Sequence, residues 1–200
     1  DLASNNIYVL HNASTLGAIS FTSGQVFSAG SNPSGVAIGN IDQDTKPDVA
    51  VSNLGSNSIS LFRNVSSAGS ISLSAPTIVS TGARPAAIVI VDLDGDGLQE
   101  LVTANAGSDA ISAFLNTSSL GSFSFAPSVD YSTGVGSAPS CIALGTILGK
   151  GAIDMIVVNP GNSTGALVAN VSTLGNIAFG GGAGPVPAIP ASVKIMDFNA

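Results

Sequence analysis

The chain has 200 residues, of which only 8% are charged and 5% aromatic, and its formal net charge is −7. Its five Lys and Arg residues are scattered and offer no basic track for phosphates, so we expect no nucleic-acid partner. No apolar run reaches the roughly 18 residues that a spanning helix needs, so we also expect no membrane span.

The sequence repeats itself with a period of about 52 residues. Two independent markers share this period. The Asn tracts NASTLGAISF, NVSSAGSISL, NTSSLGSFSF and NVSTLGNIAF begin at Asn12, Asn64, Asn116 and Asn170. A proline followed by an apolar run recurs at Pro33, Pro85, Pro139 and Pro190.

Each full period predicts four short strands. In the first, residues 35–39 (GVAIG) form a fully buried strand, and residues 48–53 (DVAVSN) and 58–64 (SISLFRN) follow with period-two alternation. The tract 70–80 (SISLSAPTIVS) is expected to be a longer fourth strand. It carries Pro76, and its equivalent carries Pro127, so this strand is placed at the sheet edge. An apolar inner strand and a proline-bearing outer strand describe a propeller blade.

We therefore predict an all-β fold of β-propeller blades with four antiparallel strands, about four blade equivalents in all. The expected boundaries are a part-blade at 1–32, blades at 33–84, 85–138 and 139–189, and the start of a further blade at 190–200. Stacking of blades should bury the first-strand residues, among them Val36, Ile38, Ile88, Ile90, Ile142, Leu144, Val193 and Ile195. Both ends interrupt the motif. A slice of a larger array is favoured over a half-propeller that pairs with another, or a closed ring with one shared blade.

An acidic loop joins the first two strands of each blade. In DLDGDGLQE, carboxylates occupy loop positions 1, 3, 5 and 9, with a glycine at position 6; alternate side chains point inward and glycine permits the bend. Hard Ca²⁺ takes 6 to 8 oxygen ligands, so Ca²⁺ is the predicted cofactor. The predicted metal ligands are Asp92, Asp94, Asp96 and Glu100, and in the preceding loop Asn40, Asp42, Asp44 and Asp48.

The two other loops depart from this pattern. In the first, Thr45 replaces the glycine, so a weaker site is expected there. In the third loop the equivalents are Thr146, Leu148, Lys150 and Asp154, which are poor ligands. We hypothesise that the Lys150 ammonium pairs with Asp154 and keeps this loop folded without metal.

With these motifs the chain resembles FG-GAP/VCBS repeats, the calcium-loop blades of integrin alpha-subunit propellers and of many secreted bacterial proteins. VAIGNIDQDTKPDVAVSN and VIVDLDGDGLQELVTAN match the strand, acidic loop and strand of the repeat. The resemblance implies radial antiparallel blades and Ca²⁺ held between strands one and two by the residues named above.

No catalytic constellation is visible, so we expect no enzyme activity. His11 is expected to be an ordinary strand residue, and Cys141 a buried small hydrophobe. The leading hypothesis is an extracellular or cell-surface module that binds a protein or glycan ligand through Ser-, Asn- and Gly-rich loops. The alternative is a structural subunit that packs against further copies of itself in a fibre or surface layer. A non-catalytic domain of a secreted enzyme ranks last.

Five Asn-x-Ser/Thr sequons occur, and four of them begin the Asn tracts. We attribute this pattern to inheritance with the repeat rather than to glycan attachment.

Overall fold

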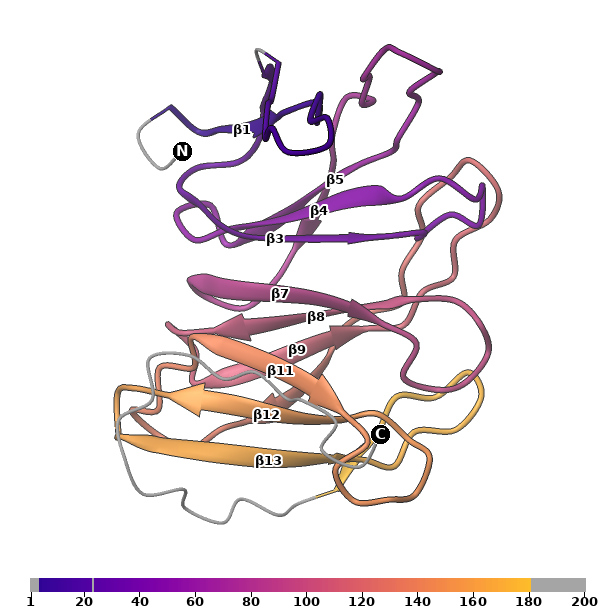
Figure 1. The fold of residues 1–200 in the computed structure, drawn as a ribbon. Helices are drawn as coiled ribbons and strands as arrows, with labels where there is room; N and C mark the ends of the chain where they lie inside the picture. Colours follow the sequence, from indigo (N-terminus) through magenta and orange to yellow (C-terminus); the bar gives the residue numbers. More distant parts are fainter. Residues whose placement is uncertain (1–3, 23, 181–200) are drawn as a thin grey trace.

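The structure, a computed structural model, describes residues 4–22 and 24–180, which form β-strands and no helix (Figure 1). Within these described residues, four antiparallel sheets succeed one another, the first with two strands and the others with four. This confirms the all-β fold built of four-stranded blades. The start of a further blade at 190–200 lies outside the described residues, as do Val193 and Ile195.

The part-blade contains β1 (Asn6–Val9) and β2 (Gln25–Ser28). The first blade contains β3 (Pro33–Gly39), β4 (Asp48–Asn53), β5 (Ser58–Phe62) and β6 (Thr77–Ser80). The second contains β7 (Pro85–Val91), β8 (Glu100–Asn105), β9 (Ala110–Phe114) and β10 (Val129–Ser132). The third contains β11 (Cys141–Gly145), β12 (Asp154–Asn159), β13 (Thr164–Asn170) and β14 (Phe179–Gly180).

Each blade is a simple meander in which consecutive strands pair. The sequence repeat produces the same register twice: Ala37 pairs with Ala50 in the first blade, and Val89 pairs with Val102 in the second. Alternation of small and β-branched residues suits strands with both faces covered. The sequence therefore specifies the blade locally.

The blades stack through their flat faces (Figure 1), and the core lies between them. Close approach requires small side chains: a Cβ on Gly35 of β3 would lie 3.3 Å from the Ala87 Cα of β7. One cluster joins the first two blades through Ile41, Ala50, Ile59, Leu61, Ile88, Leu101 and Phe114. A second cluster joins the second and third blades through residues that include Val102, Ile111, Ile142, Met155, Val157 and Val168.

The expected burial of the first strand is wrong for β3. Val36 is 61% exposed and Ile38 is 67% exposed, whereas the equivalent Ile88 on β7 is only 6% exposed. The part-blade packs Ile7 and Phe27 onto the cluster of β4 and β5, and contributes only two strands in the described residues. It therefore covers the outer part of the first blade and leaves one face of β3 open.

The expected long fourth strand is also wrong. The Asn tract folds back on itself, with bridges between Asn64 and Leu73 and between Ser67 and Ser70, and β6 begins only at Thr77. Pro76 thus precedes the strand rather than lying within it. β6 and β10 are nevertheless the edge strands of their sheets, as predicted.

A repeated clamp connects consecutive blades. The residue just before β1, β5 or β9 has a positive φ, and its side-chain oxygen accepts the backbone N–H of the residue that leads into the next blade. Asx side chains tolerate this backbone conformation and accept such bonds readily. The pairs are Asn5 with Asn32, Asn57 with Arg84, and Asp109 with Ala138.

Candidate metal centre

Three loops join the first and second strands of the blades: the first loop (residues 40–48), the second loop (92–100) and the third loop (146–154). All three have positive φ at positions 4 and 6. Those positions are Gln43 and Thr45, Gly95 and Gly97, and Gly149 and Gly151. The turn geometry is therefore common to all three, including the loop without acidic residues at positions 1, 3 and 5.

The second loop concentrates three carboxylates. One oxygen each from Asp92, Asp94 and Glu100 lies within 4.8 Å of the others. The loop backbone supports them, because Asp92 accepts N–H bonds from Gly95 and Gly97 at 2.7 and 3.1 Å. Asp96, the fourth predicted ligand of this loop, is exposed and lies outside the group.

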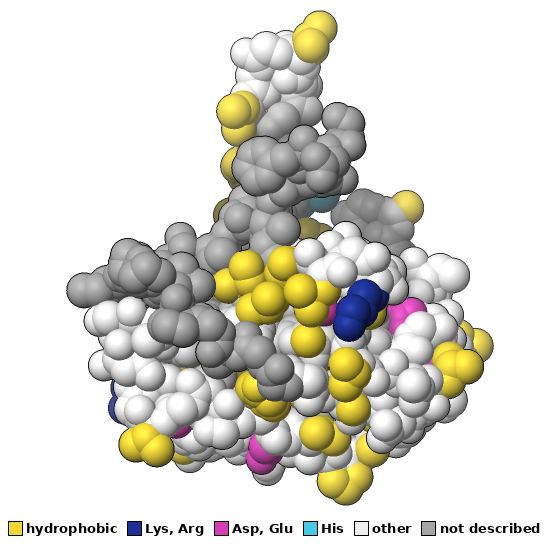
Figure 2. Space-filling view, turned by 90° about the horizontal axis from the view of Figure 1, so that it is seen from below, with side chains coloured by type: hydrophobic (Ala, Val, Ile, Leu, Met, Phe, Trp, Pro, Cys, Tyr) yellow, Lys and Arg dark blue, Asp and Glu magenta, His cyan; other side chains and the backbone are white. Residues whose placement is uncertain are grey.

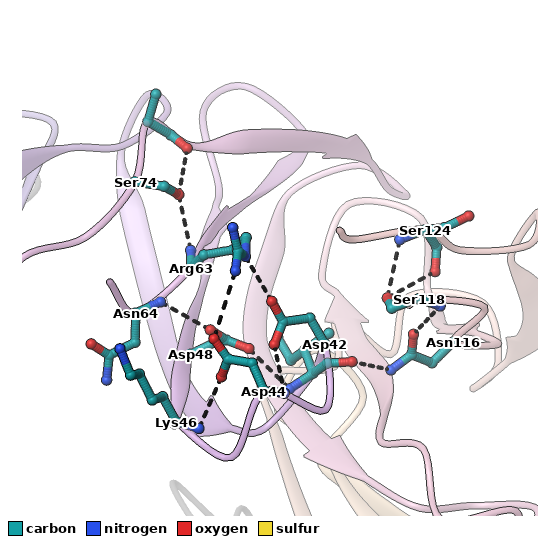
Figure 3. A network of polar contacts seen from close by, with 12 residues as sticks. Asp42, Asp44, Lys46, Asp48, Arg63, Asn64, Ser74, Asn116, Ser118 and Ser124 are labelled. Atoms are coloured by element: carbon teal, nitrogen blue, oxygen red, sulfur yellow. Dashed lines mark hydrogen bonds and ion pairs between the residues drawn. The ribbon is translucent and has the colours of Figure 1, made fainter. Parts of the chain in front are cut away.

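The first loop forms a similar group from Asp42, Asp44 and Asp48. A cationic side chain also reaches this group. Nε of Arg63, which follows β5, lies 2.6 Å from Oδ2 of Asp42, and Figure 3 shows the two side chains facing each other. The hydrogen bond to Asp42 is the main reason that the pKa of Arg63 is raised. The side-chain oxygen of Asn40, the remaining predicted ligand, is buried and has no hydrogen-bond partner among residues 4–22 and 24–180.

The third loop does not contain the predicted crosslink. No ion pair joins Lys150 to Asp154 in the part of the chain that the structure describes, and Lys150 is exposed. Asp154 is instead 3% exposed and accepts two backbone N–H groups, from Leu148 at 2.9 Å and from Asn170 at 3.0 Å. Hydrogen bonds to the main chain, rather than a lysine, hold this loop.

The same arrangement recurs at position 9 of every loop. Asp48 accepts N–H bonds from Ile41 and Asn64, and Glu100 accepts them from Leu93 and Asn116. The position-9 acid thus ties the loop to the end of the third strand with or without metal. Spacing alone identified these residues as ligands and missed this second role.

Burial makes the Glu100 and Asp48 carboxylates costly to ionise. Desolvation raises the pKa of Glu100 to about 7, despite the two N–H bonds that oppose the shift, and burial likewise raises the pKa of Asp48. The nearby Asp94 and Asp96 charges add to the rise at Glu100. A cation among these oxygens would reverse it.

Residues 40–103, which span the first and second loops, match the FG-GAP-like repeat family. This part of the chain is similar to an FG-GAP-like repeat. A β-propeller-type protein from Lactobacillus plantarum is similar in structure, with a TM-score of 0.58 and 18% sequence identity over 94% of this chain and 55% of that one. The chain thus spans about half the length of that structure. No curated protein matches.

The Asn tracts connect neighbouring blades. Nδ2 of Asn116 donates to the Ile41 carbonyl in the first loop at 2.9 Å, and Nδ2 of Asn170 donates to the Leu93 carbonyl in the second loop at 2.7 Å. Each asparagine therefore holds the acidic loop of the preceding blade. Both side chains are buried, so these two sequons serve packing in the folded chain.

The surface of the blades has few charges. The face in Figure 2 shows mainly uncharged side chains, with groups of hydrophobic ones among them. A groove of about 420 Å³ lies between β6 and the segment 123–128, and it is lined in part by Ile78, Phe123 and Phe125. Sequence reasoning missed this groove because its walls come from two blades.

The remaining residues singled out in the sequence are unremarkable in their surroundings. His11 is exposed at the end of β1, and Cys141 is a free, partly buried thiol at the start of β11. Among the described residues no helix is long and apolar enough to cross a membrane.

Proposed function

We propose that the chain is a calcium-stabilised, non-catalytic β-propeller module that serves binding or adhesion outside the cell. The observation that carries the calcium proposal is the second loop, where three carboxylates converge and the described residues include no Lys or Arg that pairs with them. Asp92, Asp94 and Glu100 offer only hard oxygen donors, the ligands that Ca²⁺ prefers. A divalent ion would also neutralise the buried Glu100.

A thermal melt of the metal-stripped chain with and without added Ca²⁺ tests this proposal. Ligand binding to the folded state alone stabilises it by about 2.7 kcal/mol at a concentration 100 times Kd. We expect Ca²⁺ to raise Tm for the wild type and for Asp130→Asn, a control that removes an exposed carboxylate on β10. Asp94→Asn should lose the response. A wild-type Tm that Ca²⁺ leaves unchanged would refute the assignment.

Millimolar Ca²⁺ is an extracellular condition, and extracellular calcium modules bind with Kd values of about 10⁻⁴–10⁻³ M. We therefore propose a secreted or cell-surface location. Calorimetric titration measures the affinity directly. A Kd in the nanomolar range, typical of cytosolic buffers, would contradict this location.

The binding role is supported by the shape of the surface. The groove between β6 and residues 123–128 is lined by both apolar and hydroxyl side chains, and β6 is an edge strand, so a protein segment or a glycan ring can lie against Ile78 and Phe123. We expect binding on a glycan array or to extracellular-matrix proteins that Ile78→Ser weakens. Leu174→Ser is the control, since that side chain is also exposed but lies away from the groove. Equal binding by both variants would exclude the groove.

The structural-subunit alternative is favoured by the open face of β3. Val36 and Ile38 expose apolar surface where the equivalent residues of β7 are covered by a neighbouring blade. Concentration-dependent association in light scattering, abolished by Val36→Ser with Ile38→Ser, would support a self-packing subunit. A monomer at all concentrations would refute it.

A further inference from the structure

The surroundings of the first and second loops differ in the residue that comes just before the Asn tract. Arg63 directly follows β5 and precedes Asn64, whereas Leu115 stands in the same place before Asn116 and Ala169 before Asn170. The position-9 acids are held in the same way, since both accept two main-chain N–H groups. Within the loops, the first has neutral Asn40 where the second has Asp92, and Lys46 where the second has Leu98. Of these differences, only Arg63 brings a cation into contact with the grouped carboxylates.

Arg63 reaches two of the three grouped carboxylates of the first loop. Its Nε lies 2.6 Å from Asp42 Oδ2 and its Nη2 lies 3.6 Å from Asp44 Oδ2. The Asp42 side chain is fully buried, that of Asp44 is 16% exposed and that of Arg63 is 30% exposed, so water screens these contacts only partly. Figure 3 shows the guanidinium pointing toward the Asp42 and Asp44 carboxylates.

The neighbouring blade closes the two sites in different ways. In the second loop, Asp94 accepts the backbone N–H of Gly175, from the Asn tract of the next blade, at 2.6 Å. The equivalent residue beside the first loop is Gly121, and the Arg63 guanidinium lies against it, 3.3 Å from where a Cβ would stand. Arg63 therefore lies between the first loop and Gly121, whereas Gly175 at the equivalent place bonds directly to Asp94 of the second loop.

We infer that Arg63 is the built-in counter-cation of the first loop and excludes a divalent ion from it, so that Ca²⁺ binds in the second loop alone. The inference rests on the proposed calcium binding of the second loop. The negative charge of each loop is then handled differently. An arginine neutralises it in the first loop, a metal ion would neutralise it in the second, and the third loop has no acids at positions 1, 3 and 5. Releasing the guanidinium would leave Asp42, Asp44, Asp48 and the unpartnered Asn40 oxygen as a second oxygen site.

Calorimetric titration of the metal-stripped chain with CaCl₂ tests the inference. We expect one equivalent to bind to the wild type, and two to bind to Arg63→Leu, which carries the residue found at the same place in the second blade. Arg84→Leu removes the same charge elsewhere and should bind one. Asp42→Asn in the Arg63→Leu background should restore a count of one.

The outcomes separate the inference from the proposed function. One equivalent in both wild type and Arg63→Leu, lost on Asp94→Asn, would overturn the inference and leave the calcium proposal intact. No binding to the wild type but one equivalent to Arg63→Leu would support the exclusion by Arg63 and refute the second-loop site. Two equivalents in the wild type, one lost on Asp42→Asn, would overturn the inference.

A second measurement covers the case in which Arg63→Leu folds poorly. The variant Arg63→Gln keeps a polar side chain without the charge. We expect both variants to have a lower Tm than the wild type in chelator and to recover it in millimolar Ca²⁺, beyond the gain that the wild type shows. A loss of Tm that Ca²⁺ does not repair would assign Arg63 a packing role only and overturn the inference.

Discussion

Replacing Asp154 by alanine should destabilise the chain strongly and independently of calcium. The carboxylate is 3% exposed and accepts the N–H groups of Leu148 and Asn170. Its removal leaves two main-chain donors in the interior without an acceptor. The third loop has no acids at positions 1, 3 and 5, so metal cannot compensate.

The magnitude follows from the two bonds. Hydrogen bonds to a charged partner contribute about 1.5–3 kcal/mol each, and a stranded buried donor costs about 1–3 kcal/mol. Removing the carboxylate also relieves its own desolvation, which offsets part of the loss. We expect a net loss of about 2–4 kcal/mol, or about 5–15 °C in Tm for a chain of this size. Asp154→Asn keeps one acceptor oxygen and should lose less.

Urea unfolding in chelator and in Ca²⁺ measures these losses, with Lys150→Ala as the matched control. That lysine is exposed and makes no ion pair with Asp154, so its removal should change stability by less than about 0.5 kcal/mol. The reasoning is refuted if Asp154→Ala unfolds at the wild-type urea concentration. It is equally refuted if Lys150→Ala loses as much as Asp154→Ala.

Three further predictions follow from the same structure. Thr45 is a β-branched residue at φ 71°, a conformation that costs about 1–3 kcal/mol, so Thr45→Gly should raise stability in urea unfolding; a lower midpoint would contradict this. Burial raises the pKa of Glu100 from 4.5 to about 7. Between these two pH values the carboxyl group has lost its proton in the unfolded state and keeps it in the metal-free folded state. Its stability should therefore fall by up to about 3 kcal/mol as pH rises from about 4.5 to 7, and Glu100→Gln should flatten the profile. The Asp109 carboxylate accepts main-chain N–H groups from Ala138 and Gly136, and these bonds lower its pKa. The stability that the ionised carboxylate gives should therefore be lost as pH falls below the ordinary range of a carboxyl group. Asp109→Asn should not show this loss.

Much of the blade could be predicted from sequence because its determinants are local and recur. Alternating apolar residues in strands such as β4 and β8, with turn residues between them, specify a meander without information from distant parts of the chain. The acidic loops were recognisable for the same reason, since their ligands lie within nine residues. The long fourth strand was a wrong prediction because Asn64 to Ser67 pairs back locally, and a period-two pattern does not distinguish a hairpin from a strand.

The sequence by itself determined the blades, their register and the oxygen-rich loops, since these depend on short-range spacing. The tertiary structure decided which loop's carboxylates pair with an arginine. Arg63 lies 21 residues from Asp42, and only folding of β5 against the first loop brings the guanidinium to the carboxylate. The contact of Asn116 with Ile41 spans 75 residues and depends on the stacking of two blades. Charge compensation and burial act through space, and so they became visible only when the blades were packed.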